Sequence, residues 1–125
     1  MADFLSDLYE QGKFFFGTSA GAIILANEWV RWPDLDGSSS AELFPCLGFA
    51  PVICDCHDEE SGWEELKTAL ELKENGTKGY GLAAGSAVKV FPDGNLEVLS
   101  GAVHPYIRKG SRIDRMPDML PGDRW

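Results

Sequence analysis

The sequence predicts a single α/β domain in which a partly parallel sheet is followed by a small antiparallel β-meander. Three observations support this fold class. The chain has 125 residues, enough for one compact domain and too few for two. In its first 75 residues, short apolar runs alternate with helical patterns, as in proteins with parallel strands. After them, apolar and polar residues alternate on both sides of Pro92-Asp93-Gly94, a hairpin turn signal.

The first elements are a helix, a strand and a second helix. Residues 2–11 place three apolar side chains on one helical face, and Gly12 ends that helix. Residues 13–16, Lys-Phe-Phe-Phe, are too few for a helix and are typical of a strand buried on both faces. Residues 17–21 form a glycine-rich turn, and an alanine-rich helix follows it.

The middle of the chain combines a loop, a second strand and a third helix. Residues 32–40 are rich in turn-forming residues and predict a loop. Residues 49–54 predict a second apolar strand. Ser61 is a good cap for a helix over residues 63–73, whose acidic first turn suits the positive end of a helix.

The C-terminal part predicts antiparallel strands over residues 86–91, 95–99 and 103–107. We expect residues 1–110 to form the single domain and residues 111–125, rich in Arg, Asp, Pro and Gly, to form a loosely packed tail. A doubly wound sheet normally has about five parallel strands, whereas this chain offers two or three. One sheet edge should therefore be exposed, and we expect a homodimer in which a second copy covers it.

The net charge argues against several kinds of partner. Eleven Lys and Arg against 20 Asp and Glu give a formal net charge of −9, and so acidic a surface repels nucleic acid and anionic membranes. No apolar stretch approaches the roughly 20 residues that span a bilayer. The first seven residues lack the basic region of a signal peptide. We therefore expect a cytoplasmic protein without a nucleic-acid or membrane partner.

The cysteines bear on redox state and metal binding. Cys46, Cys54 and Cys56 are an odd number, and without a secretion signal they predict no disulfide framework. Cys54 and Cys56 precede His57, but they lack the usual spacing of zinc ligands, and no second ligand pair follows. We therefore expect no metal site.

Gly17-x-Ser19-x-Gly21, between a predicted buried strand and a helix, has the sequence context of a nucleophile elbow. A catalytic serine must stand clear of the sheet on a strained turn, where side chains two positions to either side would collide with the flanking elements. The N–H of Ala20 would then bind a developing oxyanion. A plainer interpretation is a tight turn in which Ser19 only caps the helix.

The residues of this turn resemble those of a known family. Residues 17–22, Gly-Thr-Ser-Ala-Gly-Ala, with residues 12–16 before them, are similar to the nucleophile region of the S51 serine peptidases, which include peptidase E (aspartyl dipeptidase) and cyanophycinase. The resemblance continues through residues 42–48 to His57 and reaches residues 79–82 and the hairpin. It implies a class I glutamine amidotransferase-like (flavodoxin-like) sheet, truncated here because family members carry further strands before the elbow.

The resemblance also implies roles for single residues. His57, after the second predicted strand, would be the general base that deprotonates Ser19. Asp34, fifteen residues beyond Ser19, matches the acid of peptidase E, whereas the cyanophycinase branch has a glutamate where this chain has Ala84. His104 has no counterpart and is expected to be structural. Three further carboxylates stay open as the acid: Asp36, Asp55 and Glu59.

The implied activity is that of a serine peptidase acting on short peptides, including those with an amino-terminal Asp, without a metal or organic cofactor. Ser19, His57 and Asp34 would form the catalytic site, with Ala20 N–H as oxyanion donor. The family's second oxyanion donor comes from a glycine-rich loop before the elbow, and losing such a donor costs about 2.7–4 kcal/mol. Two alternatives therefore stay open: a non-catalytic homodimeric binding protein, and a truncated α/β-hydrolase esterase, whose Ser-Asp-His order is the same.

Overall fold

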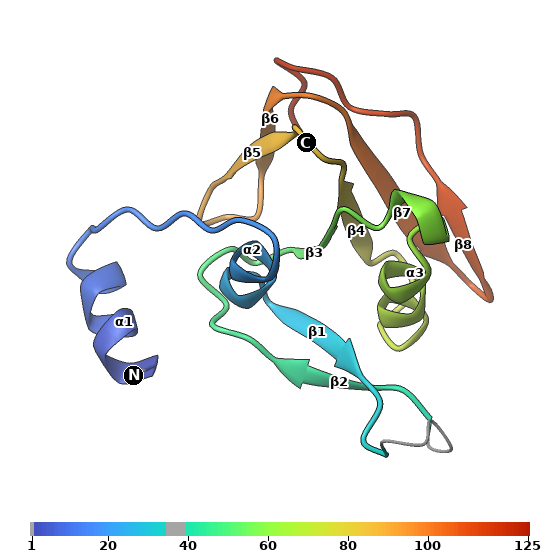
Figure 1. Ribbon diagram of the computed structural model, residues 1–125, viewed down its shortest axis with the longest axis horizontal. Coiled ribbons are helices and arrows are strands. Elements are labelled where there is room, and N and C mark those ends of the chain that lie inside the picture. Colours follow the sequence, from blue (N-terminus) through green and yellow to red (C-terminus); the bar gives the residue numbers. More distant parts are fainter. Residues whose placement is uncertain (1, 35–39) are drawn as a thin grey trace.

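The computed structural model describes residues 2–34 and 40–125 (Figure 1). The loop predicted over residues 32–40 therefore lies partly outside the described residues. Within them, the chain forms helices and strands in this order: α1 (Ala2–Glu10), α2 (Ala20–Leu25), β1 (Glu28–Arg31), β2 (Glu42–Pro45), β3 (Ile53–Cys56), the 3-10 turn η1 (Glu59–Ser61), α3 (Glu64–Glu71), β4 (Lys78–Leu82), β5 (Ala87–Val90), β6 (Leu96–Ser100), β7 (Val103–Lys109) and β8 (Arg112–Arg115).

The largest sheet has four strands in the order β3-β4-β7-β8. β3 and β4 are parallel, while β4 with β7 and β7 with β8 are antiparallel. β1 pairs with β2, and β5 pairs with β6, in two separate antiparallel hairpins. This architecture confirms the predicted α/β class, with a partly parallel sheet and antiparallel strands toward the C-terminus.

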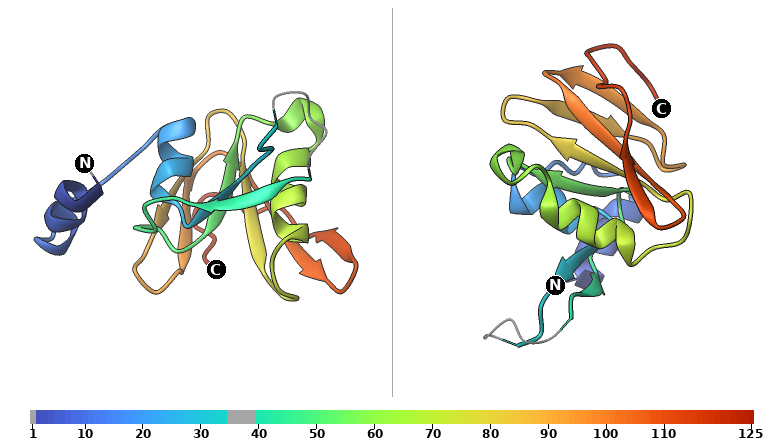
Figure 2. Two further views of the ribbon diagram at one scale, coloured as in Figure 1. Left: turned by 90° about the horizontal axis from the view of Figure 1, so that it is seen from below. Right: turned by 90° about the vertical axis from the view of Figure 1, so that its right-hand side faces the viewer.

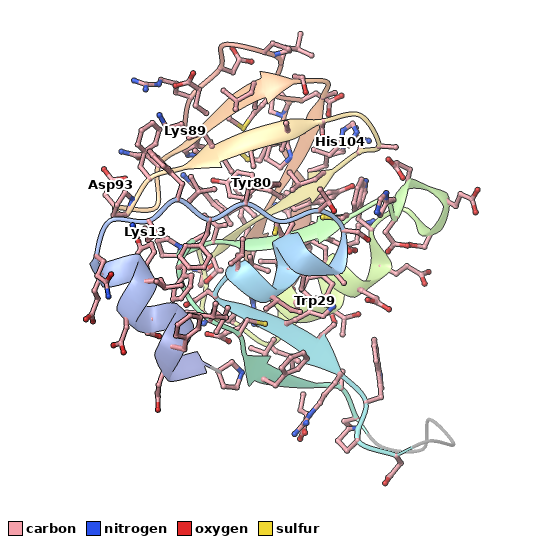
Figure 3. All side chains as sticks on the ribbon, turned by 60° about the vertical axis from the view of Figure 1, so that its left-hand side comes forward. Lys13, Trp29, Tyr80, Lys89, Asp93 and His104 are labelled. Atoms are coloured by element: carbon pink, nitrogen blue, oxygen red, sulfur yellow. The ribbon has the colours of Figure 1, made fainter. Side chains whose placement is uncertain are left out.

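Apolar side chains from this sheet enter two cores. Ile53 of β3 joins Trp29, Leu66 and Leu70 in the core beneath α3. Cys54, the next residue of β3, joins a second core with Tyr80, Leu96 and Val103. Figure 3 labels Trp29 in the first core and Tyr80 in the second. Successive residues of a strand point to opposite faces, so β3 is buried on both sides.

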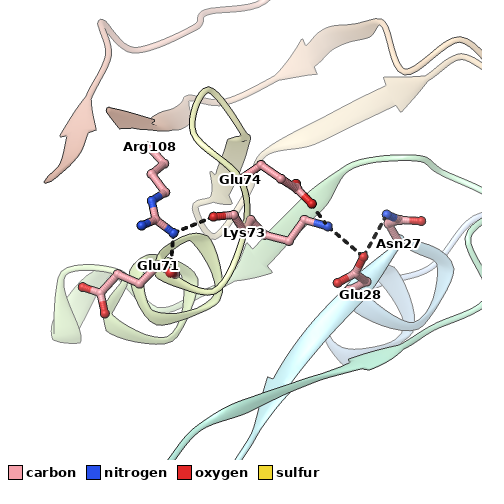
Figure 4. A network of polar contacts seen from close by, with 6 residues as sticks. All are labelled: Asn27, Glu28, Glu71, Lys73, Glu74 and Arg108. Carbon is pink, nitrogen blue, oxygen red and sulfur yellow. Dashed lines mark hydrogen bonds and ion pairs between the residues drawn. The ribbon is translucent and has the colours of Figure 1, made fainter. Parts of the chain in front are cut away.

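Two glycines let α3 lie close against β4. A Cβ atom at Gly79 would lie 2.8 Å from Leu66 Cδ1, and one at Gly81 would lie 2.7 Å from the indole ring of Trp63. The other end of the helix is held by Arg108 of β7, whose guanidinium donates to the carbonyls of Glu71 and Lys73 (Figure 4). These contacts fix α3 against the sheet at both ends.

The strand predicted over residues 13–16 is not present. This segment has no regular secondary structure, and Phe14 and Phe16 are 98% and 92% exposed. A strand forms only where a neighbouring strand accepts and donates its backbone hydrogen bonds, and within the described residues β3 pairs with β4 alone. Phe15 instead packs on Phe49, with ring centroids 4.9 Å apart. The prediction of a buried strand here is wrong.

The structure agrees with the predicted end of α1, start of α3 and hairpin turn. Gly12 ends α1 with a φ of 84°, and Lys13 N–H donates to Leu8 O at 3.1 Å. Ser61 Oγ accepts from Glu64 N–H at 3.3 Å, which supports the start of α3. The hairpin turn closes where Gly94 N–H donates to Phe91 O at 2.9 Å. In the described ranges, no helix is long and apolar enough to cross a membrane.

The last residues pack more closely than the loose tail that the sequence predicts over 111–125. Residues 112–115 form β8, and Met119 is buried in the second core. Trp125 and Leu96 exchange two backbone hydrogen bonds of 2.8 Å. The apolar side chains of Met119 and Trp125 draw this polar segment onto β6 and β7. The division of the chain at residue 110 stays a prediction.

Candidate functional site

The candidate site lies where α2 begins and β3 ends. Ala50 N–H donates to Leu25 O and Asn27 N–H donates to Val52 O, both at 2.9 Å, so the C-terminal end of α2 meets the chain just before β3. The two elements pack against each other, and the left view of Figure 2 shows them running in opposite directions, α2 in blue and β3 in green. The start of α2 and the end of β3 therefore face the same end of the sheet.

Ser19 has a strained backbone at the start of α2. Its φ of 55° and ψ of −124° are rare for a residue with a side chain, and strain of this kind clusters at active sites. Its exposed hydroxyl makes no capping hydrogen bond to the helix. Ser19 therefore occupies the N-cap position of α2 without capping the helix through its side chain.

The two glycines that flank Ser19 differ in what they permit. A Cβ atom at Gly17 would lie 2.5 Å from the backbone C and O atoms of Gly21, so no side chain fits there. A Cβ atom at Gly21 would meet nothing within 4 Å. The turn thus requires glycine at position 17, as expected, whereas the collision expected at position 21 is absent.

The backbone amide of Ala20 is next to this hydroxyl in the chain. Gly21 N–H donates to Thr18 O at 2.9 Å and Ala22 N–H donates to Ser19 O at 3.0 Å, but Ala20 N–H has no acceptor within residues 2–34 and 40–125. An oxyanion requires an amide of this kind, free to donate. The role of Ala20 stays a prediction.

His57 follows β3 and is exposed. Its φ is 47°, and its N–H donates to Leu82 O at 3.1 Å, so it extends the contact between β3 and β4 by one residue. In the part of the chain that the structure describes, the His57 ring makes no hydrogen bond, and none joins it to Ser19. Among the described residues, nothing therefore occupies the hydrogen-bonding positions of the ring.

Asp34, the acid implied by the resemblance, lies in the segment after β1, whereas His57 lies after β3. Asp34 is exposed in the segment after β1. Figure 1 shows this segment at the lower edge of the view, apart from η1, which follows His57. Asp36 lies outside the described residues. The role of Asp34 as the orienting acid stays a prediction.

A second candidate acid, Glu59, lies beside His57 in the sequence. Its carboxylate accepts a hydrogen bond from Ala84 N–H at 2.7 Å. The pKa of Glu59 is lowered first by a hydrogen bond from its own N–H and next by that from Ala84, and the charges of His57 and His104 also lower it. The carboxylate of Glu59 is therefore within electrostatic reach of both histidines.

Asp55, the third candidate acid, is buried in β3. Burial raises the pKa of Asp55 to about 7, and the charges of Asp58 and Glu65 also raise it, while a hydrogen bond from Cys56 N–H opposes the shift. Burial likewise raises the pKa of Cys54 to about 12 and that of Cys56 to about 11, so both thiols are protonated at neutral pH. Among the residues that the structure describes, no three or more metal-binding side chains come together.

His104 reaches this end of the sheet from β7, where it pairs with Gly81 of β4. Its Nδ1 lies 2.8 Å from Asp118 Oδ1, and Arg115 Nη2 lies 2.9 Å from the same oxygen. This contact ties β7 to the C-terminal segment and fits the expected structural role. No pattern in the sequence indicates this partner, because Asp118 lies fourteen residues from His104 in a segment without clear periodicity.

A separate hollow lies beside the turn between β5 and β6. Its lining includes Lys73, Lys78, Asp93 and Trp125, with Lys78 Nζ 3.9 Å from the centroid of the Trp125 ring. Figure 3 shows Asp93 and His104 on opposite sides of the molecule. The hollow is thus remote from the end of the sheet where His104 lies.

Comparisons with known proteins bear on this arrangement. A search of curated proteins gives no match. A family model, described as peptidase family S51, matches residues 1–98, which is 98 of the 125 residues and includes Ser19, Asp34 and His57. The match therefore covers both helix α2 and the β3–β4 pair. On this evidence the chain belongs to peptidase family S51.

Proposed function

We propose that this chain is a serine peptidase of short peptides in which Ser19 is the nucleophile and His57 is its general base. Membership of the family supports a peptidase-like function. The observation that carries the finer proposal is the strained turn at Ser19, whose φ of 55° is combined with a hydroxyl that is exposed and does not cap the helix. Such a backbone at a serine before a helix is what a nucleophile elbow requires.

The proposed reaction is acyl transfer in two steps. Ser19 Oγ bonds to the carbonyl carbon of the scissile peptide while its proton passes to His57, and Ala20 N–H donates to the oxyanion. The C–N bond then breaks, and His57 gives the proton to the leaving amine. Water releases the acyl group by the same steps in reverse, with His57 again taking and returning one proton.

Two carboxylates compete for the role of the acid that orients His57. The resemblance supports Asp34, and peptides with an amino-terminal Asp belong to the same resemblance. The charge of His57 acting on Glu59 supports the closer residue. We expect Asp34→Asn or Glu59→Gln, but not both, to slow the reaction of Ser19 by up to about 10⁴-fold.

A second candidate function is a non-catalytic homodimeric binding protein. The exposed Phe14 and Phe16 favour it, because this extended segment offers both apolar side chains and free backbone groups to another chain. This candidate predicts a dimer whose mass does not fall on dilution, and which leaves a library of dipeptides uncleaved. A monomer at every concentration would remove it.

Labelling with a fluorophosphonate tests the leading proposal. We expect the wild type to be labelled and Ser19→Ala not to be labelled. Ser111→Ala is a matched control, because Ser111 is an exposed serine outside the site, in the turn between β7 and β8. Absence of label from the folded wild type, or equal label on Ser19→Ala, would contradict the proposal.

A further inference from the structure

Two buried carboxyl oxygens, on residues to either side of His57 in the sequence, have no hydrogen-bond donor among the described residues. Asp55 Oδ2 and Asp58 Oδ2 are buried, and neither has a hydrogen-bond partner within the described residues. Buried polar atoms are nearly always hydrogen-bonded, so each exception needs an explanation. Here the two exceptions stand at the last but one residue of β3 and at the residue after His57.

Among the described residues, the two charges that shift the pKa of Asp55 are both negative, those of Asp58 and Glu65. Asp55 is 4% exposed. β4 places Gly81 beside it, and the indole ring of Trp63 packs on that glycine. From α3 the charged neighbour is Glu65, and within β3 the neighbours are the thiols of Cys54 and Cys56.

One proton would satisfy both oxygens. A protonated carboxyl group is a hydrogen-bond donor, whereas an ionised one only accepts. If Asp55 keeps its proton, its Oδ2–H can donate to Asp58 Oδ2. The side chains of Asp55 and Asp58 are within hydrogen-bonding reach of each other. Two carboxyl groups so placed do not both ionise readily, because the second charge would be repelled by the first.

We propose that Asp55 and Asp58 share one proton and that this carboxyl–carboxylate hydrogen bond closes the turn that presents His57. The pair belongs to positioning, not to the reacting groups, and only its effect on catalysis rests on the proposed function of His57. The raised pKa of Asp55, about 7, agrees with a proton that is held near neutral pH.

The backbone of the turn is held on either side of His57. Asp55 Oδ1 accepts from Cys56 N–H at 2.8 Å. Asp58 O accepts from Trp63 N–H at 3.1 Å and from Ser61 Oγ–H at 3.2 Å. Between them His57 has a φ of 47°, which is unfavourable for a residue with a side chain. The shared proton would join the two sides, and its loss would place two repelling charges across them.

The direct test is a pH titration of the wild-type protein, followed by the side-chain ¹³Cγ signals of Asp55 and Asp58. We expect the pair to release one proton with an apparent pKa near 7, and the backbone amide signal of His57 to shift over the same pH range. If both carboxyl groups instead release their protons in the ordinary acidic range, the proposal is overturned.

Variants show whether the pH-dependent signal arises from Asp55 and Asp58 or from a neighbouring carboxylate. In Asp58→Asn, the side-chain amide can donate a hydrogen bond to Asp55, so Asp55 no longer has to keep a proton. The pH-dependent change of the His57 backbone amide signal near pH 7 should therefore disappear. Asp55→Asn should remove the same change, and one of the two variants serves as the test if the other folds poorly. Glu60→Gln, which removes an exposed carboxylate from the same η1 turn, should leave the shift unchanged. An unaltered shift in both Asn variants would overturn the proposal.

These measurements require no turnover. If the titration is found but Ser19 cannot be labelled, the shared proton stands and the proposed peptidase fails. If Ser19 is labelled but the titration is absent, the reverse holds. Where both stand, labelling of Ser19 in the wild type should slow above about pH 7 relative to Asp58→Asn, because repulsion between the two carboxylates then displaces His57.

Discussion

The N-terminal segment and the sheet that α3 covers differ in the exposure of their aromatic side chains. In residues 13–16, Phe14 and Phe16 are almost fully exposed. Trp63, just before α3, and Tyr106 of β7 are both 4% exposed. The difference arises from the neighbours and not from the residue types, because β4 offers Gly79 and Gly81 as a surface on which α3 packs. An apolar run is buried only where another element provides the matching face.

This comparison also locates the candidate site. Ser19 follows the loosely held N-terminal segment, whereas His57 follows a strand buried on both faces. The proposed base therefore follows a buried strand, whereas the proposed nucleophile lies on a turn whose own backbone is strained.

The largest effect is expected from emptying the core beneath α3. Leu70→Ala should lower the free energy of unfolding by about 2–5 kcal/mol, because Leu70 is fully buried and its removal leaves a cavity. Leu72→Ala, two residues later and 44% exposed, is the matched control and should change it much less. Chemical denaturation of the two variants measures the difference, and equal losses would contradict the described packing.

A smaller effect is expected from pH. The pKa of Asp55 in the folded protein is about 7, above its ordinary value of 3.8. The folded state therefore binds more protons than the unfolded state between these values, and stability is lost as the pH rises from about 4 to about 7. The slope contributed by Asp55 is at most about 1.4 kcal/mol per pH unit.

Comparing the wild type with Asp55→Asn isolates the contribution of Asp55 to the pH dependence of stability. Denaturation of Asp55→Asn should lack the decline that Asp55 adds to the wild type, while the lowered pKa of Asp118, held by His104 and Arg115, acts in both proteins alike. Parallel stability curves for wild type and Asp55→Asn between pH 4 and 7 would show that Asp55 is ionised throughout.

The smallest effect is expected in the N-terminal segment. Phe14→Ser and Phe16→Ser should each change the free energy of unfolding by no more than about 0.5 kcal/mol, because the side chains are exposed in the single chain. The same substitutions should weaken self-association if a second copy covers this segment. A large loss of stability in a dilute monomer would mean that the segment is packed after all.

Local signals were sufficient for several elements. Gly12, Ser61 and Gly94 mark helix and hairpin boundaries through their own backbone or capping preferences, and the structure has boundaries beside all three. The hairpin formed by the four-residue strands β1 and β2 has no comparable signal in the sequence. Their pairing depends on register between segments on either side of a loop, which no short pattern contains.

In the candidate site, too, the sequence predicts local features but not contacts between distant segments. The glycine-rich pattern predicted the strained turn at Ser19, because strain and the need for Gly17 are local. It could not predict that Glu59 would reach Ala84, 25 residues later. Nor could it predict that Asp55 and Asp58 would each bury an oxygen for which the described part of the chain provides no donor. Those contacts follow from how β3, η1 and β4 pack, and only the folded chain brings them together.

The most direct test of the account is the rate at which Ser19 reacts with a fluorophosphonate in the wild type and in His57→Ala. General-base catalysis contributes about 10²–10⁴-fold, so we expect the variant to react at least about 100-fold more slowly while keeping its fold. Equal rates in the two proteins would contradict the claim that the end of β3 activates the serine at the start of α2.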